Sequence, residues 1–162
     1  MSADLPGVSL RPASLADRQM LADLALASKA VWGYDAAMLA SWRAELTPRA
    51  GCIAQRPFVL AESAGRCLGF YSLQPPAGDG EGWALDNLWV APDSIGRGLG
   101  RLLLADARAL ARSRGIGLLH IDADPHAEPF YLSQGARRVG AIAAPLPGQP
   151  ERLRPQLILP CA

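Results

Sequence analysis

The chain has 162 residues, half of them hydrophobic, which is enough for one domain with a sizeable core. Its formal net charge of +1 gives no case for nucleic acid or an anionic membrane as partner, and no apolar run reaches the roughly 18 residues of a membrane span. Three cysteines without a close histidine partner favour reduced thiols over a disulfide framework or a zinc site. We therefore expect a single cytoplasmic domain over residues 1–162, with no metal and, from the character of residues 1–12, no signal peptide.

The first third of the chain predicts one strand and two helices. Residues 8–11 alternate between apolar and polar, as a short strand does. Ser14 and Asp17 are spaced like a capping box, so a helix is expected from there to about residue 30. Asp35 has the side chain of an N-cap and predicts a second helix that ends near residue 46.

Two apolar strands joined by a hairpin are predicted next. They occupy residues 58–62 and 67–73, and the loop between them, 63–66, contains a glycine. A turn-rich loop over residues 75–82 then leads to a further strand, 83–90.

The second half of the chain predicts helices and strands in alternation. A leucine-rich helix over residues 99–113 connects the strand 83–90 to a strand at 118–122, so these two strands should be parallel. A short helix follows at 127–134, with Gly135 as the residue just after its end.

Two last strands, 138–143 and 157–159, complete the order β-α-α-β-β-β-α-β-α-β-β. This order predicts a mixed α/β (α+β) domain. We expect a mostly antiparallel sheet of about six to seven strands, flanked by about four helices.

The most informative segment runs from residue 88 to residue 104. An apolar strand enters a turn with three glycines at alternate positions, Gly96, Gly98 and Gly100. Without side chains, the backbone N–H groups of such a turn can approach a ligand closely, and the following helix points its own unpaired N–H groups at the same place. Arg97 and Arg101 lie here, with no acidic residue from position 96 through 105. The segment predicts a phosphate-binding site.

Two other phosphate-binding loops have patterns similar to this segment. A nucleotide P-loop needs Lys and then Ser or Thr after its second glycine, whereas Gly100 is followed by Arg101 and Leu102. A dinucleotide fingerprint needs its third glycine one position later, although Asp122 would stand for the ribose-binding acid. Because the turn also follows a hairpin instead of opening the first βαβ unit, dinucleotide binding remains the less favoured alternative.

The segment resembles motif A of the GNAT superfamily of acyl-CoA N-acyltransferases. That motif reads Gln/Arg-x-x-Gly-x-Gly/Ala after a strand end of the form L-x-V-x-P. Gly98 and Gly100 take the places of the glycines, and residues 88–92 take the place of the strand end. Ile95 departs from the pattern, because Gln or Arg is usual there.

A second segment, residues 124–136, resembles the family's Asn-x-x-Ala-x-x-x-Tyr…Gly-Phe motif. Asp124 stands for the Asn, Ala136 stands for the Phe, and Tyr131 matches the tyrosine. Its separation from the glycine turn, one helix and one strand, is also that of the family. Uncharacterised bacterial GNAT proteins are similar in these segments and in the Trp-Gly-Tyr loop at 32–34.

The resemblance implies the GNAT fold and direct transfer of an acetyl group from acetyl-CoA, the co-substrate, to an amine. Such an enzyme is an acyltransferase for groups other than aminoacyl groups. The resemblance further implies which residues bind acetyl-CoA: Leu88, Trp89, Val90, Ile95, Gly96, Arg97, Gly98, Leu99, Gly100, Arg101, Asp124, Ala127 and Tyr131. The strand end would bind the pantetheine amides through its backbone, and the turn would bind the pyrophosphate.

Two residues are the candidates for proton transfer. Tyr131 matches the family's tyrosine and would protonate the departing thiolate, since a phenol with a reference pKa of about 10 is protonated at neutral pH. Asp86 is the candidate base. It lies two residues before Leu88, on the same face of the strand, and Ala84 stands where relatives commonly carry an acid. Packing of Tyr131 under a helix and pairing of Asp86 with an arginine are the alternatives.

The acceptor is expected to be a small-molecule or protein amine. Trp32 and Tyr34 would stack on it or cage it, and Glu45 would hold a cationic amine; otherwise the aromatics belong to the core and Glu45 is solvated. Relatives are often dimers, so a homodimer is an expectation by association. A catalytically silent acyl-CoA-binding module is the alternative function, prompted by Ala84 and Ile95.

Overall fold

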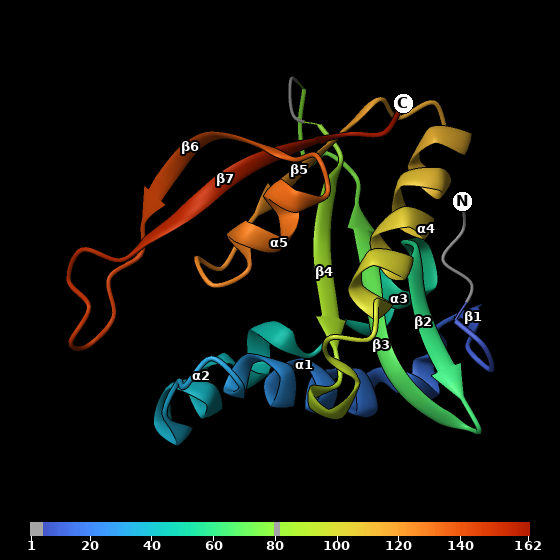
Figure 1. Ribbon diagram of the computed structural model, residues 1–162, viewed down its shortest axis with the longest axis horizontal. Coiled ribbons are helices and arrows are strands. Elements are labelled where there is room, and N and C mark those ends of the chain that lie inside the picture. The colour runs from blue at the N-terminus through green and yellow to red at the C-terminus, as the bar shows by residue number, and fades with distance from the viewer. Residues whose placement is uncertain (1–4, 80–81) are drawn as a thin grey trace. The chain divides into compact units, whose positions relative to one another are not determined.

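A computed structural model describes residues 5–79 and 82–162 of the chain, as two compact units (Figure 1). The first unit consists of Met1–Leu73 and Asn87–Ala107, and the second of Gln74–Asp86 and Arg108–Ala162. The expectations for residues 1–4 and for positions 80–81 of the loop lie outside the described residues. The single domain over residues 1–162 stays a prediction.

The strands form a seven-stranded sheet in the hydrogen-bonded order β1-β2-β3-β4-β5-β7-β6. The strands are β1 (Ser9–Pro12), β2 (Phe58–Ser63), β3 (Arg66–Gln74), β4 (Ala84–Val90), β5 (Leu118–Asp122), β6 (Arg137–Ala143) and β7 (Leu153–Pro160). Antiparallel pairing joins β1 to β2, β2 to β3, β5 to β7 and β6 to β7, whereas β4 and β5 are parallel with Ala84 opposite His120. The predicted fold class and the predicted parallel pair are confirmed.

The helices are α1 (Arg18–Ala30), α2 (Ala36–Leu46), α3 (Ala50–Gln55), α4 (Leu99–Ser113) and α5 (Glu128–Ser133), with 3₁₀ turns at Leu15–Asp17 and Pro92–Ser94. Helix α4 and strand β5 have the predicted bounds at both ends. The short helix α3 was not predicted, and β7 begins four residues earlier than expected. None of the helices within residues 5–79 and 82–162 is both long and apolar enough to cross a membrane.

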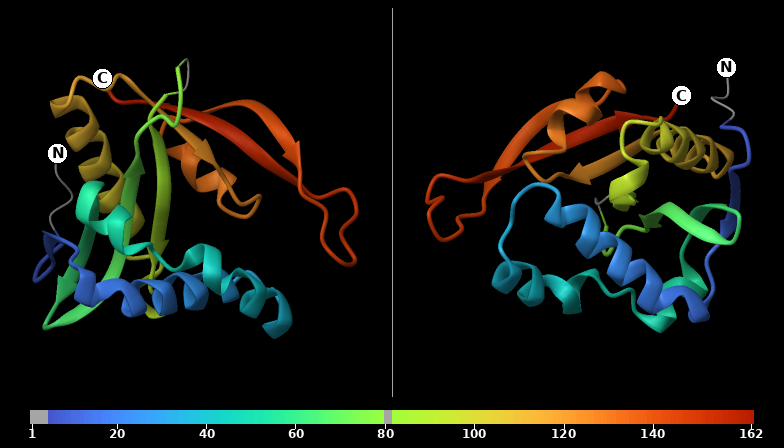
Figure 2. Two further views of the ribbon diagram at one scale, coloured as in Figure 1. Left: turned by 180° about the vertical axis from the view of Figure 1, so that it is seen from behind. Right: turned by 60° about the horizontal axis from the view of Figure 1, so that its bottom comes forward.

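Helices α1 and α2 lie side by side in the first unit (Figure 2). The predicted cap of α2 is present, since Asp35 Oδ1 accepts a hydrogen bond of 2.8 Å from the backbone N–H of Met38. Arg43 of α2 and Asp23 of α1 form an ion pair of 2.9 Å. Residues 31–35 connect the two helices. The Asp35 cap at the start of α2 and the ion pair between α1 and α2 restrict this connection.

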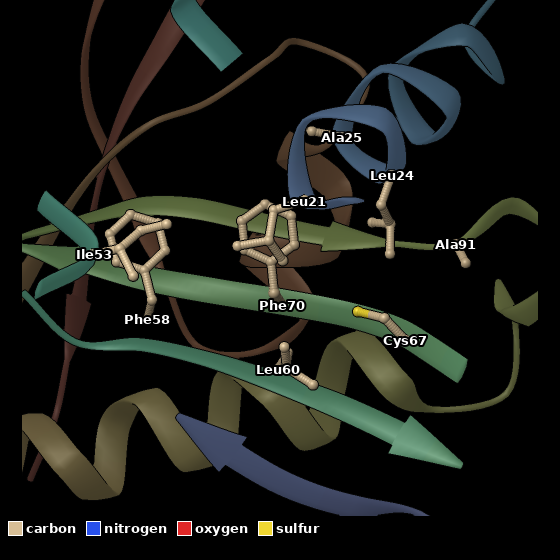
Figure 3. Close-up of a cluster of buried hydrophobic side chains, with 9 residues drawn as sticks. All are labelled: Leu21, Leu24, Ala25, Ile53, Phe58, Leu60, Cys67, Phe70 and Ala91. Carbon is tan, nitrogen blue, oxygen red and sulfur yellow. The ribbon is translucent and has the colours of Figure 1, made fainter. Parts of the chain in front are cut away.

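Alternating residues of β3 face two different layers of the first unit. Phe70 is fully buried in a cluster with Leu21 of α1 and Leu60 of β2, and Figure 3 shows these side chains gathered between the strands and α1. Its neighbours Gly69 and Tyr71 face α4: a Cβ on Gly69 would lie 3.0 Å from Leu103, and the Tyr71 hydroxyl donates a hydrogen bond of 2.6 Å to Asp106. The start of α4 is thus fixed against β3.

The second unit is built on β5, β7 and β6. Leu119 of β5 and its partner Leu159 of β7 are both fully buried. Strands β6 and β7 form a hairpin, and Arg152 of its connection lies 3.4 Å from Asp124, just after β5 (Figures 1 and 2). Arg108 of α4 donates a hydrogen bond of 3.1 Å to the carbonyl oxygen of Gln134, which joins the second half of α4 to the end of α5.

Candidate functional site

The glycine turn between β4 and α4 has a backbone that side chains other than glycine rarely adopt. Gly96 has a φ of +83° and Gly98 a φ of +86°, both in the left-handed region. A Cβ added at either glycine would meet nothing within 4 Å, so the backbone borders open space on that side. Gly96 and Gly98 thus leave space beside the backbone of the turn, as a phosphate site here would need.

The turn leaves a run of backbone N–H groups without carbonyl partners. The N–H of Ser94 bonds to the carbonyl of Ala91, and the next such bond begins at Leu102, whose N–H donates to Gly98. Within the described part of the chain, no backbone carbonyl accepts from the N–H groups of residues 95–101. Three of these residues form the first turn of α4, where the helix dipole adds positive potential.

Three of the four side chains of the turn are exposed, and two of these carry positive charge. Arg97 and Arg101 are exposed, the first turn of α4 contains no acid, and the Ile95 side chain is 49% exposed. The nearest acid along the chain, Asp93, forms an ion pair of 2.6 Å with Arg66, and this hydrogen-bonded partner lowers the pKa of Asp93. The carboxylate beside the turn is therefore already paired with a cation.

The end of β4 is held by side-chain hydrogen bonds and by one close backbone approach. The Trp89 indole N–H donates to Asn87 Oδ1 at 3.0 Å, and Asn87 Nδ2 donates to Ser72 Oγ at 2.8 Å. A Cβ on Gly69 would lie only 2.6 Å from the carbonyl oxygen of Trp89, a distance that real Cβ atoms do not adopt. Only glycine at position 69 allows β3 to lie this close to the strand end.

Tyr131 lies in α5 with its side chain buried. Desolvation raises the pKa of the hydroxyl above its ordinary value of 10.0, so it is a neutral O–H over the physiological range. Its ring contacts Phe130 edge-on at a centroid distance of 5.4 Å. Among residues 5–79 and 82–162, no partner is hydrogen-bonded to the Tyr131 hydroxyl. Gly135 has a φ of +97° just after the helix, which confirms its predicted place.

Asp124 is held by neighbours of its own unit. Its Oδ1 accepts the backbone N–H of His126 at 2.9 Å and lies 2.8 Å from the imidazole Nδ1, and its Oδ2 lies 3.4 Å from Arg152 Nη2. Both the Asp124 and the Arg152 side chains are only 7% exposed. The N–H of Ala127 bonds to the carbonyl of Asp124, so Asp124 and Ala127 shape the turn that starts α5.

The carboxylates of the central strands have different surroundings. Asp86 is exposed on β4, and Ala84, two residues before it, is partly buried. Asp122 binds Arg154 with two hydrogen bonds of 2.9 and 3.0 Å and also accepts one from Gln156. Asp122 is thus paired with Arg154, and the role of Asp86 as the base stays a prediction. His120 stands against Gly82, where a Cβ would lie 2.7 Å from its Nε2.

Each of the two aromatic residues predicted at the acceptor side, Trp32 and Tyr34, contacts another aromatic ring. Trp32 and Trp89 lie 6.2 Å apart with planes tilted by 48°, and Tyr34 contacts Trp42 edge-on at 4.9 Å. Lys29, which was not predicted as a site residue, lies among these rings. The side chain of Glu45 is exposed on α2, and its role in holding a cationic amine stays a prediction.

The fold and the turn together define a class of protein: a mixed α/β protein whose strand-turn-helix junction offers backbone donors and cations to an anion. A model of the acetyltransferase (GNAT) family matches residues 21–136, and the chain belongs to this family. The matched range contains both segments that resemble the family's motifs, residues 88–104 and 124–136. No curated protein matches the chain.

Solved structures with the same fold cover nearly the whole chain. A GCN5-related N-acetyltransferase from Rhodopseudomonas palustris is 24% identical, with 93% of each chain covered and a TM-score of 0.74. PaiA N-acetyltransferase from Thermoplasma acidophilum, in complex with coenzyme A, is 18% identical, with 93% of this chain and 97% of that chain covered and a TM-score of 0.72. The structure of yncA from Salmonella typhimurium with its cofactor acetyl-CoA is 20% identical, with 96% and 95% covered and a TM-score of 0.67.

Proposed function

We propose that the protein is an N-acetyltransferase that moves the acetyl group of acetyl-CoA directly to an amine, which is a small molecule or a protein. The observation that carries the proposal is the run of unengaged N–H groups at 95–101, in a chain of the GNAT family. The similar proteins with coenzyme A and with acetyl-CoA support the choice of co-substrate.

The turn fits the pyrophosphate of acetyl-CoA. Its N–H groups need an acceptor, Gly96 and Gly98 leave room beside the backbone, and Arg97 and Arg101 supply positive charge. Because the main chain provides most of the donors, Ile95 in place of Gln or Arg weakens the site without removing it.

The chemistry that we propose needs three contributions from the chain. Backbone N–H groups of residues 88–90 bind the pantetheine and polarise the thioester carbonyl. Asp86 takes a proton from the acceptor amine, directly or through water. The amine nitrogen then bonds to the acetyl carbon, the C–S bond breaks, and Tyr131 gives its proton to the departing thiolate.

The properties of Tyr131 support its part in this scheme. An acid must be protonated before it acts, and burial keeps the Tyr131 hydroxyl protonated. A hydroxyl that is not committed to a partner in its own chain is able to donate to a ligand.

The test is the release of thiol from acetyl-CoA in the presence of a panel of primary amines. We expect turnover with at least one amine and, by calorimetry, binding of acetyl-CoA but not of NAD. Binding of acetyl-CoA without turnover of any amine would support a silent acyl-CoA-binding module, and binding of NAD alone would support the dinucleotide alternative.

A further inference from the structure

Four aromatic rings surround the ammonium of Lys29 in the first unit. Lys29 Nζ lies 4.4 Å from the ring centre of Trp42, 5.1 Å from that of Tyr34, 5.8 Å from that of Trp89 and 6.0 Å from that of Trp32. All four distances fall within the range of about 6 Å over which an aromatic ring attracts a cation. We call Trp32, Tyr34, Trp42 and Trp89 the aromatic cage.

The walls of the aromatic cage come from separate parts of the chain. Trp32 and Tyr34 follow α1, Trp42 lies in α2, and Trp89 lies in β4. Trp89 is fixed by its bond to Asn87 and Trp42 by its edge-on contact with Tyr34. The cage is therefore built by the fold and does not depend on Lys29 alone for its shape.

The aromatic cage is accessible from solvent. Tyr34 is 7% exposed, whereas the three tryptophans are half-buried. Lys29 stands in the last turn of α1 and reaches the cage with a flexible stem of four carbons. A side chain of this kind has the reach to move its ammonium between the rings and water.

The type of cation at position 29 agrees with a site for a compact ammonium. Lys29 is the only lysine among the 16 basic residues of the chain, and the rest are arginines. An ammonium is a compact point charge, whereas a guanidinium is a broad plane that stacks on rings. The aromatic cage thus holds the one side chain in the protein whose head group matches an alkylammonium ligand.

We propose that the aromatic cage is a binding site for an alkylammonium group of the acceptor, and that Lys29 is a built-in occupant which this group displaces. The proposal rests on the proposed function, since it takes the ligand to be the acceptor amine. Rings stabilise an ammonium in its charged form, which is not a nucleophile. The caged group is therefore not the one that reacts, and the acceptor class is an amine with a second alkylammonium group, as in an aliphatic diamine.

The first experiment measures binding without any reaction. The probe is tetramethylammonium, which has no N–H to acetylate, titrated by calorimetry against sodium chloride of equal ionic strength. The variant Lys29→Met, which keeps the length of the stem but has no charge, should bind the probe at least tenfold more tightly than the unaltered protein. Lys29→Gln provides the same comparison if Lys29→Met does not fold.

Two tryptophan variants test whether the probe binds in the aromatic cage. Combined with Lys29→Met, Trp42→Leu should abolish binding of the probe, whereas Trp83→Phe, which changes the one tryptophan outside the cage, should leave it unchanged. Equal affinity with and without Lys29, or no binding in any variant, would overturn the proposal and leave Lys29 as a structural contact.

The second experiment compares acceptors in the acetyl-transfer assay. We expect 1,4-diaminobutane to have a kcat/KM at least tenfold above that of 1-aminobutane, with the difference removed by Trp42→Leu. Turnover of both amines at equal rates would overturn the proposal that the aromatic cage binds the acceptor, and it would leave the proposed function intact. Binding of tetramethylammonium by Lys29→Met without turnover of any amine would overturn the proposed function and leave the cage intact.

Discussion

Two regions of the molecule contribute to the proposed function in different ways. The turn at residues 95–101 would act through its main chain, and the segment around α5, residues 124–135, through its side chains. The turn offers its main chain, with two glycines at positive φ, and all of its side chains except Leu99 are exposed. The segment around α5 buries Tyr131 and Asp124 and depends on what those side chains are. Side-chain identity should therefore matter little in the turn, glycines excepted, and greatly in the segment around α5.

The largest effect should come from filling the space beside the turn. Gly98→Glu adds a negative side chain where we place the pyrophosphate, and we expect a loss of at least 100-fold in affinity for coenzyme A by calorimetry. The control is Gly115→Glu, because Gly115 also has a positive φ, +74°, and open space around it, but lies beyond the other end of α4. Equal losses in the two variants would mean that backbone strain, and not the phosphate site, is responsible.

The next effect concerns the side chain of Tyr131. Tyr131→Phe should lower kcat by about 10²-fold, with a small change in the KM for acetyl-CoA, because a positioned proton donor contributes on that order. Tyr71→Phe is a matched control, since it removes the hydroxyl of another buried tyrosine, which donates to Asp106. A rise in KM without a fall in kcat would assign Tyr131 to binding.

The raised pKa of Tyr131 also predicts how stability depends on pH. The folded protein keeps this proton where the unfolded chain, with the ordinary pKa of 10.0, loses it. The contribution to the free energy of unfolding is full below pH 10.0 and declines as the pH rises toward the folded pKa. The free energy of unfolding, measured in urea, should fall less between pH 9 and pH 11 in Tyr131→Phe than in the unaltered protein. Equal falls in the two proteins would contradict the raised pKa of Tyr131.

A smaller effect is expected for Asp124, whose side chain stabilises the turn before α5. Asp124→Asn removes the charge that faces the buried guanidinium of Arg152, and we expect about 2 kcal/mol lower stability in urea unfolding. Asp79→Asn, in the loop before β4, is an exposed control that should change stability little. A stable Asp124→Asn variant with impaired binding of coenzyme A would instead give Asp124 a direct role with the ligand.

The smallest effect should be a gain in affinity for coenzyme A. Ile95→Arg restores the type of side chain that the GNAT motif usually carries, and a new exposed cation beside a phosphate is expected to tighten binding by roughly 0.5–1 kcal/mol. The gain should vanish at high salt, where exposed charges are screened, and Ile95→Leu should show no gain. A gain that persists in salt would point to contacts other than charge.

Periodicity and turn chemistry predicted the parts of the fold that are local. Helix α4 and strand β5 have the predicted bounds because an amphipathic leucine pattern and an apolar run lie between clear glycine signals. Helix α3 was missed, since six residues with a glycine and no cap give no periodic signal. Strand β7 begins before the predicted residue 157, and Pro155 within it pairs with Ala141 of the neighbouring strand β6.

The part of the candidate site that lies within one short segment could be predicted from the sequence. The part whose residues are far apart in the sequence and meet only in the fold could not. The turn at residues 95–101 can be found from its glycines alone. The aromatic cage joins Lys29 to Trp42 and Trp89, residues far apart in the sequence, so no spacing rule finds it. Locally, Lys29 lies three residues before Trp32 at the end of α1, and this spacing alone does not predict the aromatic cage.

The single lysine has a practical consequence for labelling. Lys29 is the one side-chain primary amine that a reagent such as a succinimidyl ester can modify. Its rate of modification, followed by mass spectrometry, reports how often the ammonium leaves the rings, without any engineered probe. Slowed labelling in the unaltered protein relative to a Trp42→Leu variant would make this one amine a built-in reporter of the state of the acceptor side.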